Sequence, residues 1–173
     1  MTGTKKFLAV AAVIVLAGLA RADGIRQSST KYGFSVVLPG VAKSEEKSYD
    51  TPAGTLKQYN MMHADNGRVY IVSANELPPA LLVLATDTDM EMCRTSFVDG
   101  FVKGINGTLT SSKSYSDGAF SGTEVIVNGA GVTLHGRVFL SGGKLYAMFT
   151  TETAEATEFY KSFQIEKGVA LGK

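Results

Sequence analysis

Residues 136–147 read GRVFLSGGKLYA, and this stretch decides the fold. Gly142-Gly143 tolerates the positive φ angles of a two-residue turn, so it predicts a hairpin of two antiparallel strands. The facing pairs in that register are Leu140–Leu145, Phe139–Tyr146 and Val138–Ala147. One face carries Val138, Leu140, Leu145 and Phe149, and the other carries Phe139, Tyr146 and Met148. Because both faces are apolar, we expect these strands in the middle of a sheet that is covered on both sides.

A second hairpin is predicted further back in the chain. Asn66-Gly67 is the dipeptide that best fits a type I′ turn, and it separates Leu56–Ala64 from Val69–Ala74. The facing pairs are Ala64–Val69, His63–Tyr70, Met62–Ile71 and Met61–Val72. Proline cannot donate to a strand ladder, so the second strand ends before Pro78-Pro79.

Other segments supply the remaining strands. Gly33–Leu38 alternates and stops at Pro39-Gly40, as a strand followed by a turn does. Ala42–Tyr49 is polar, which suits an exposed edge strand. A third pair, 120–127 and 132–140, flanks a loop at 128–131; this register places Glu124 opposite His135.

Two segments have helical periodicity. In the first, Thr88 and Glu91 match a capping box at the start of the helix. Its apolar stripe consists of Met90, Cys93, Phe97, Phe101 and Ile105, with Val98 and Val102 beside it. The second helix is Ala154–Phe163, with Thr153 as a plausible N-cap. One helix can cover each face of the sheet, so the fold class is α+β with a largely antiparallel sheet.

The first 22 residues predict export. Lys5-Lys6 precede an uncharged apolar run, FLAVAAVIVLAGL, from Phe7 to Leu19. Ala20-Arg21-Ala22 supplies the small residues that signal peptidase accepts. Thirteen helical residues span about 20 Å, less than the ~30 Å hydrocarbon core of a bilayer. We therefore expect a cleaved signal peptide at 1–22, no membrane anchor afterwards, and a periplasmic or extracellular protein.

The remaining 151 residues are enough for one domain with its own core. We divide them into a flexible lead-in at 23–31, a domain at 32–166 and a tail at 167–173. Cleavage removes three basic residues and leaves 14 basic and 16 acidic side chains, a net charge of −2. This net charge does not indicate a nucleic-acid-binding protein, which would carry an excess of basic residues. The single cysteine, Cys93, cannot form an internal disulfide, so packing must stabilise the domain.

The order of these elements resembles the PsbP-like family of exported bacterial domains, which are related to the extrinsic PsbP protein of photosystem II. The resemblance runs from about Tyr32 to Ile165. The segments that carry it are GFSVVLPG at 33–40, TPAGT at 51–55, GRVFL at 136–140, and FYKSF at 159–163. It implies an α/β/α sandwich around an antiparallel sheet of about six to seven strands, with two main helices. It also implies accessory or binding roles, with no shared catalytic residues.

Soft metal ligands give an alternative function. Met61 and His63 share one face of their strand, and Cys93 could complete a copper site, because copper(I) prefers thioether, thiolate and imidazole ligands. The competing interpretation is packing: Cys93 lies on the apolar stripe of its helix, where a free cysteine behaves as a small hydrophobe. Met90 and Met92 lie about 200° apart on that helix and cannot easily grip one ion.

A hydrolase is the third possibility. A nucleophilic Cys93 would need a nearby histidine as base, and His135 facing Glu124 could act as a general base with its orienting carboxylate. No recognised catalytic motif accompanies either arrangement.

We therefore expect a non-catalytic exported accessory or ligand-binding domain without a cofactor. Its partner would be an envelope protein complex or a small ligand. Three surfaces are candidates: Ala53–Lys57, the connection Leu77–Thr86, and the exposed side of the strand with Tyr59, Met61 and His63. In the connection, Pro78, Pro79, Leu81 and Leu82 either cap the sheet or form a docking surface.

Overall fold

The computed structural model describes residues 24–83, 86–151 and 156–166. Its centre is a seven-stranded sheet in which all neighbours are antiparallel, in the order β3-β4-β5-β9-β8-β7-β6. The strands are β3 Lys43–Thr51, β4 Gly54–Asp65, β5 Arg68–Glu76, β6 Thr108–Ser116, β7 Ser121–Gly129, β8 Val132–Ser141 and β9 Lys144–Thr150. The hairpin at 136–147 supplies β8 and β9, which lie inside the sheet as its two apolar faces predict.

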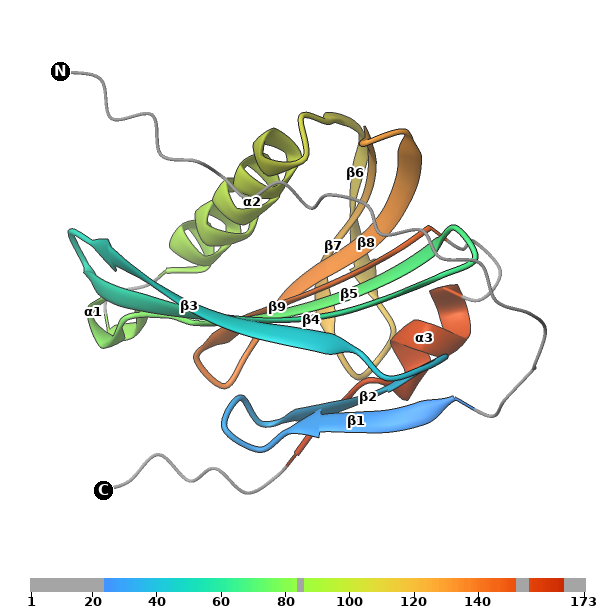
Figure 1. The fold of residues 1–173 in the computed structure, drawn as a ribbon. Helices are drawn as coiled ribbons and strands as arrows, with labels where there is room; N and C mark the ends of the chain where they lie inside the picture. Colours follow the sequence, from blue (N-terminus) through green and yellow to red (C-terminus); the bar gives the residue numbers. More distant parts are fainter. Residues whose placement is uncertain (1–23, 84–85, 152–155, 167–173) are drawn as a thin grey trace, which may run out of the picture.

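The sheet is covered on both faces (Figure 1). On one side lies the long helix α2, Asp87–Gly104. On the other lie α3, Ala156–Ser162, and a small sheet of β1 Ile25–Ser29, β2 Phe34–Leu38 and β10 Gln164–Ile165. A short helix, α1 Pro79–Val83, follows β5. The α+β class is confirmed.

Two hairpin registers are confirmed and a third is corrected. The pairs Leu140–Leu145 and Met61–Val72 stand as predicted. The turn between β7 and β8, however, is the two-residue Ala130-Gly131, with both φ angles positive, rather than a loop at 128–131. The tighter turn shifts the register by two residues, which keeps every side chain on its predicted face but pairs Glu124 with Arg137 and His135 with Ile126.

The start of α2 also differs from the prediction. Its N-cap is Thr86, not Thr88, and the capping box is completed by Asp89 rather than Glu91. The backbone N–H of Thr86 donates to the Asp89 carboxylate at 2.7 Å, and the N–H of Asp89 donates to the Thr86 hydroxyl at 3.2 Å. The Thr86 hydroxyl also donates to this carboxylate, at 2.8 Å, and the backbone and hydroxyl donors of Thr86 together hold the pKa of Asp89 below its usual range. Aspartate at this position is less common than Glu or Gln, so the standard pattern pointed two residues too late.

The lead-in at 23–31 was expected to be loose, and it is mostly strand. β1 pairs antiparallel with β2, with Ile25 facing Leu38. The Gln27 side chain closes the connection to β3, donating to the Gly40 carbonyl at 2.8 Å and accepting from the Ala42 N–H at 3.0 Å. Polar side chains concealed this strand because its stability comes from main-chain pairing rather than from a buried face.

Each of the two layers that cover the sheet forms a separate hydrophobic core with it. Under β1, β2 and α3 lies the first core: Tyr32, Phe34, Val36, Leu38, Met61, Tyr70, Val72, Ala74, Phe139, Tyr146, Met148, Phe159, Tyr160 and Phe163. Under α2 lies the second core: Leu77, Val98, Val125, Val127, Leu134, Val138, Leu145, Ala147 and Phe149, with Cys93, Phe97, Phe101, Val102 and Ile105 packed against it. Phe101 stacks on Phe149 with ring centroids 4.0 Å apart. The predicted division of the two helices between the two faces is confirmed, while Thr153 lies outside the described residues.

Candidate docking surface

The three soft-ligand candidates do not meet. Met61 is 3% exposed inside the first core, whereas Cys93 packs half-buried against the second core on the opposite face of the sheet. The Nδ1 atom of His63 lies 3.1 Å from the Val41 carbonyl, and a methyl group added at Gly40 would lie 2.4 Å from its Cε1. Within the described ranges, no group of three His, Cys, Asp or Glu residues is placed to hold a metal ion.

The strand side with Tyr59, Met61 and His63 was expected to be exposed, and most of it is covered. Tyr59 stacks on Tyr32, with ring centroids 5.0 Å apart, and Met61 lies beneath the small sheet. The cause is the β1–β2 hairpin, whose covering role is not evident from the sequence. This side is therefore part of the core.

His135 and Glu124 belong to different pairs. The Glu124 carboxylate binds Lys113 at 2.8 Å and Arg137 at 3.4 Å. These two cations, Lys113 first, hold the pKa of Glu124 below its usual range. His135 contributes its carbonyl, which accepts a 2.9 Å hydrogen bond from the Tyr160 hydroxyl.

Arg137 is the centre of a polar cluster that joins α3 to the sheet. Its guanidinium lies 4.7 Å from the Tyr115 ring centroid and 4.5 Å from that of Tyr160, so it sits within cation–π distance of both. It also pairs with Asp117 at 3.0 Å. Burial raises the pKa of both tyrosines, which stay neutral. Each charge here has its partner, so the cluster holds the fold together.

The α1 segment separates into an inner and an outer set. Pro78 is buried and Leu82 packs against the second core, so these two cap the sheet, as one of the two interpretations of this segment proposed. Pro79 is exposed, Leu81 is 37% exposed and Val83 is 80% exposed. We call Pro79, Leu81 and Val83 the α1 surface. Val83 was missed from the sequence because the segment was taken for a loop rather than a helical turn.

Two of the three candidate segments meet at this end of the sheet. A methyl group added at Gly54, in the β3–β4 turn, would lie 3.2 Å from Cβ of Pro78. The Leu77 N–H donates to the Gly143 carbonyl in the β8–β9 turn at 3.3 Å. The α1 surface is therefore supported by contacts with two hairpin turns and is not part of a free loop.

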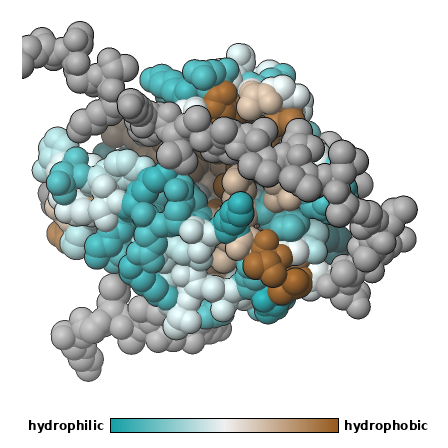
Figure 2. Space-filling view, viewed as in Figure 1, coloured by the Kyte–Doolittle hydropathy of each residue, from teal (hydrophilic) through white to brown (hydrophobic). Residues whose placement is uncertain are grey.

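The rest of the visible surface is mostly polar. Figure 2 shows a hydrophilic band over the edge formed by β3, with hydrophobic colour confined to small areas. Most β3 side chains are exposed, among them Lys43, Glu45 and Glu46. A charged edge strand resists unwanted pairing, as predicted for this segment.

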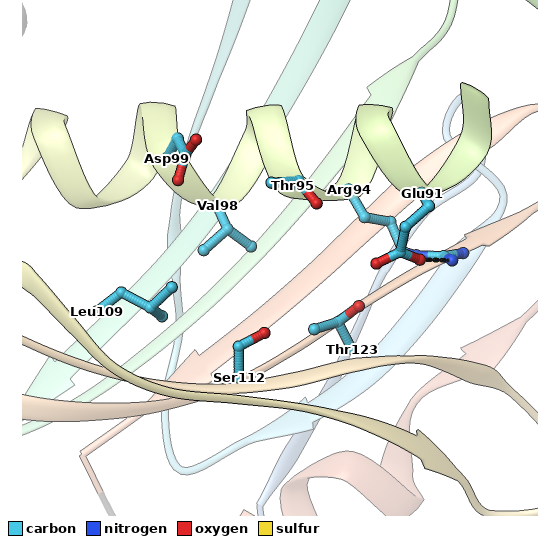
Figure 3. A pocket seen from close by; sticks show the side chains of 8 residues that line it. All are labelled: Glu91, Arg94, Thr95, Val98, Asp99, Leu109, Ser112 and Thr123. Carbon is cyan, nitrogen blue, oxygen red and sulfur yellow. Dashed lines mark hydrogen bonds and ion pairs between the residues drawn. The ribbon is translucent and has the colours of Figure 1, made fainter. Parts of the chain in front are cut away.

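A small cavity lies between α2 and the β6–β7 pair (Figure 3). Its volume is about 40 Å³, and its lining is Glu91, Arg94, Thr95, Val98, Asp99, Leu109, Ser112 and Thr123. Arg94 forms an ion pair with Glu91 at its margin. The sequence gives no sign of this cavity, because its shape depends on how α2 lies across the sheet. No helix in the described part of the chain is both long and apolar enough to cross a membrane.

No protein-family model matches this chain, and no curated protein matches it. Among solved structures, it is similar to the solution structure of cyanobacterial PsbP (CyanoP) from Synechocystis sp. PCC 6803. The match has a TM-score of 0.48 and 17% sequence identity, and it covers 88% of this chain and 98% of that chain.

Proposed function

We propose that this chain is an exported, non-catalytic binding domain that docks onto a protein partner through the α1 surface. The observation that carries the proposal is the division of α1, which turns Leu82 into the core while Leu81 and Val83 face outward. Leu81 is 37% exposed and Val83 is 80% exposed, so both have apolar surface that a partner can cover.

The rest of the fold holds the exposed side chains of α1 in place. A helix of five residues is too short to be stable alone, so α1 depends on its contacts with the rest of the fold. Leu77, Pro78 and Leu82 provide these contacts at the sheet end. Burying Val83, which is 80% exposed, against a partner would contribute up to about 2 kcal/mol, and burying the 37% of Leu81 that is exposed would contribute up to about 1 kcal/mol.

The polar residues around α1 suit a protein partner. Lys57 and Glu76 form an ion pair of 3.9 Å in the strands next to the β3–β4 turn, and Lys144 begins β9 at the same end. An apolar centre with a polar, ionised border is the usual anatomy of a protein interface. The export signal that the sequence predicts at 1–22 supports a partner in the envelope or outside the cell.

A photo-crosslinking amino acid at position 83 tests this proposal. The matched control carries the same group at Ala64. This residue is also exposed, but it lies at the end of β4 that is far from Gly54 and α1. In the native host, position 83 should give one defined protein adduct that position 64 does not give. Identical adducts from both positions, or none from position 83, would refute docking through α1.

A further inference from the structure

The strand β6 is an edge with little protection. It is the last strand of the seven-stranded sheet and pairs only with β7 among the described strands. The pairing is regular from Ser111 to Ser116, and its bulge is confined to the start, between Leu109 and Ser111. The outer side of an edge strand carries main-chain donors and acceptors that can pair with another chain. β6 carries a single charged residue, Lys113, whereas the opposite edge, β3, carries five: Lys43, Glu45, Glu46, Lys47 and Asp50.

Helix α2 packs on the face of the sheet over β6, β7 and β8, and it leaves part of β6 exposed. Figure 3 shows Glu91, Arg94 and Val98 reaching from α2 toward the strands, with Ser112 and Thr123 pointing back toward the helix. Ser112 is exposed and Leu109 is 38% exposed, although both line the cavity under α2. An exposed sheet edge with a side-chain cavity next to it can accept an added strand.

We propose that an extended peptide segment of a partner protein adds to β6 as an eighth strand and places a lysine side chain in this cavity. The added strand would lie about 4.8 Å beyond β6. Its side chains would alternate between the two faces, so that the one next to Ser112 on the α2 face enters the cavity. Main-chain hydrogen bonds would provide affinity and the cavity would provide selectivity.

The lining determines the choice of side chain. Glu91 and Asp99 supply two carboxylates against the one guanidinium of Arg94, a formal charge of −1. Thr95, Ser112 and Thr123 add hydroxyl oxygens that can accept hydrogen bonds. The 40 Å³ volume has room for one terminal ammonium group, whose three donors can bond to these oxygens. The lysine stem can then cover the exposed side of Leu109.

The test uses a synthetic probe, acetyl-TVTKTVT-amide, with its lysine replaced by norleucine or glutamate in two companion peptides. Amide NMR of the isotope-labelled protein follows chemical shifts and hydrogen exchange along β6 at up to about 1 mM peptide. We expect the lysine peptide to shift and protect β6 amides and to bind about fivefold more tightly than the glutamate peptide. Asp99→Asn should remove most of that preference, while Asp87→Asn, on α2 but outside the cavity lining, should keep it.

Two proline variants test the strand addition itself. Adjacent residues of an edge strand direct their N–H groups to opposite sides. Of Ser112→Pro and Lys113→Pro, the variant that still folds has lost an outward donor, and it should bind the lysine peptide at least fivefold more weakly. The proposal is overturned by unchanged β6 amides, by equal affinity for all three peptides, or by a concentration-dependent dimer in which a second copy protects β6. None of these outcomes would affect the α1 surface, which the crosslink at Val83 tests separately.

Discussion

The guanidinium of Arg137 lies 4.5 Å from the ring centroid of Tyr160, which links β8 of the sheet to α3 of the cover. The Tyr160 hydroxyl continues the link by donating to the carbonyl of His135 on the same strand. Because the first core lies between α3 and the sheet, this contact closes one side of that core. It also explains why a charged residue is half-buried on a central strand: two rings and two carboxylates replace its water.

Replacing Arg137 with methionine should destabilise the domain by about 2 kcal/mol. The methionine keeps much of the packing volume but removes both cation–π contacts and two ion pairs. Urea unfolding followed by circular dichroism measures the change. Lys161→Met is the control on α3, because the side chains of its ion pair with Glu158 are 67% and 78% exposed and the pair should contribute less than about 0.5 kcal/mol. Equal losses from the two variants would contradict the role given to Arg137.

Two glycines should respond in opposite directions to alanine. A methyl group at Gly136 would lie 2.4 Å from the Phe149 ring in the second core, so Gly136→Ala should cost about 1–3 kcal/mol. A methyl group at Gly100, in the middle of α2, meets nothing within 4 Å. Gly100→Ala should therefore stabilise the protein by about 0.5–1 kcal/mol through helix propensity. Thermal unfolding of both variants gives the two signs directly, and a stabilising Gly136→Ala would show that the packing around Phe149 is looser than described.

The acid stability of the domain should depend on Glu124. Lys113 and Arg137 depress the pKa of Glu124 in the folded state, so the stabilisation is present above the unfolded value of about 4.3 and is lost as the pH falls through the folded pKa. Glu124→Gln should consequently be less stable than wild type at neutral pH, and the difference should shrink in strong acid. Urea unfolding midpoints of wild type and Glu124→Gln, taken at neutral pH and in strong acid, measure this difference. A difference that persists unchanged in acid would mean that shape, rather than charge, explains the loss.

Export can be tested at the N-terminus. If residues 1–22 are a signal peptide, protein recovered from the native host should begin at Asp23. Ala22→Asp, which replaces the small residue before the cut, should slow processing and leave the longer form in the membrane fraction. Ser28→Asp places the same charge downstream of the cut and is the control. Intact-mass measurement distinguishes the two forms. A wild-type protein that still carries residues 1–22 would contradict the export prediction.

The strands could be predicted where local chemistry decided them. Asn66-Gly67 and Gly142-Gly143 fix their turns, so the registers around them were predicted correctly. Ala130-Gly131 defeated the same reasoning, because Ala130 takes a positive φ of 52° that alanine rarely adopts. β1 was missed because its main-chain pairing with β2, rather than an apolar face of its own, stabilises it.

The candidate site was only partly predictable. Pro78, Pro79, Leu81 and Leu82 were singled out as one set, but only the helical turn of α1 determines that Leu82 points inward and Val83 outward. The distance between Met61 and Cys93 depends on which helix covers which face of the sheet. That assignment follows from tertiary packing, and periodicity along the chain contains no information about it.

Native mass spectrometry of the processed protein, recovered gently from its own host, tests the central claim most directly. Wild-type protein should carry a co-purifying protein, and the double variant Leu81→Ser with Val83→Ser should lose it while keeping the wild-type circular dichroism spectrum, since both side chains are exposed. A wild-type chain that is recovered alone, or a double variant that retains the same partner, would contradict docking through the α1 surface. A mass increase of one copper ion would instead favour a metal-binding role over the docking role proposed here.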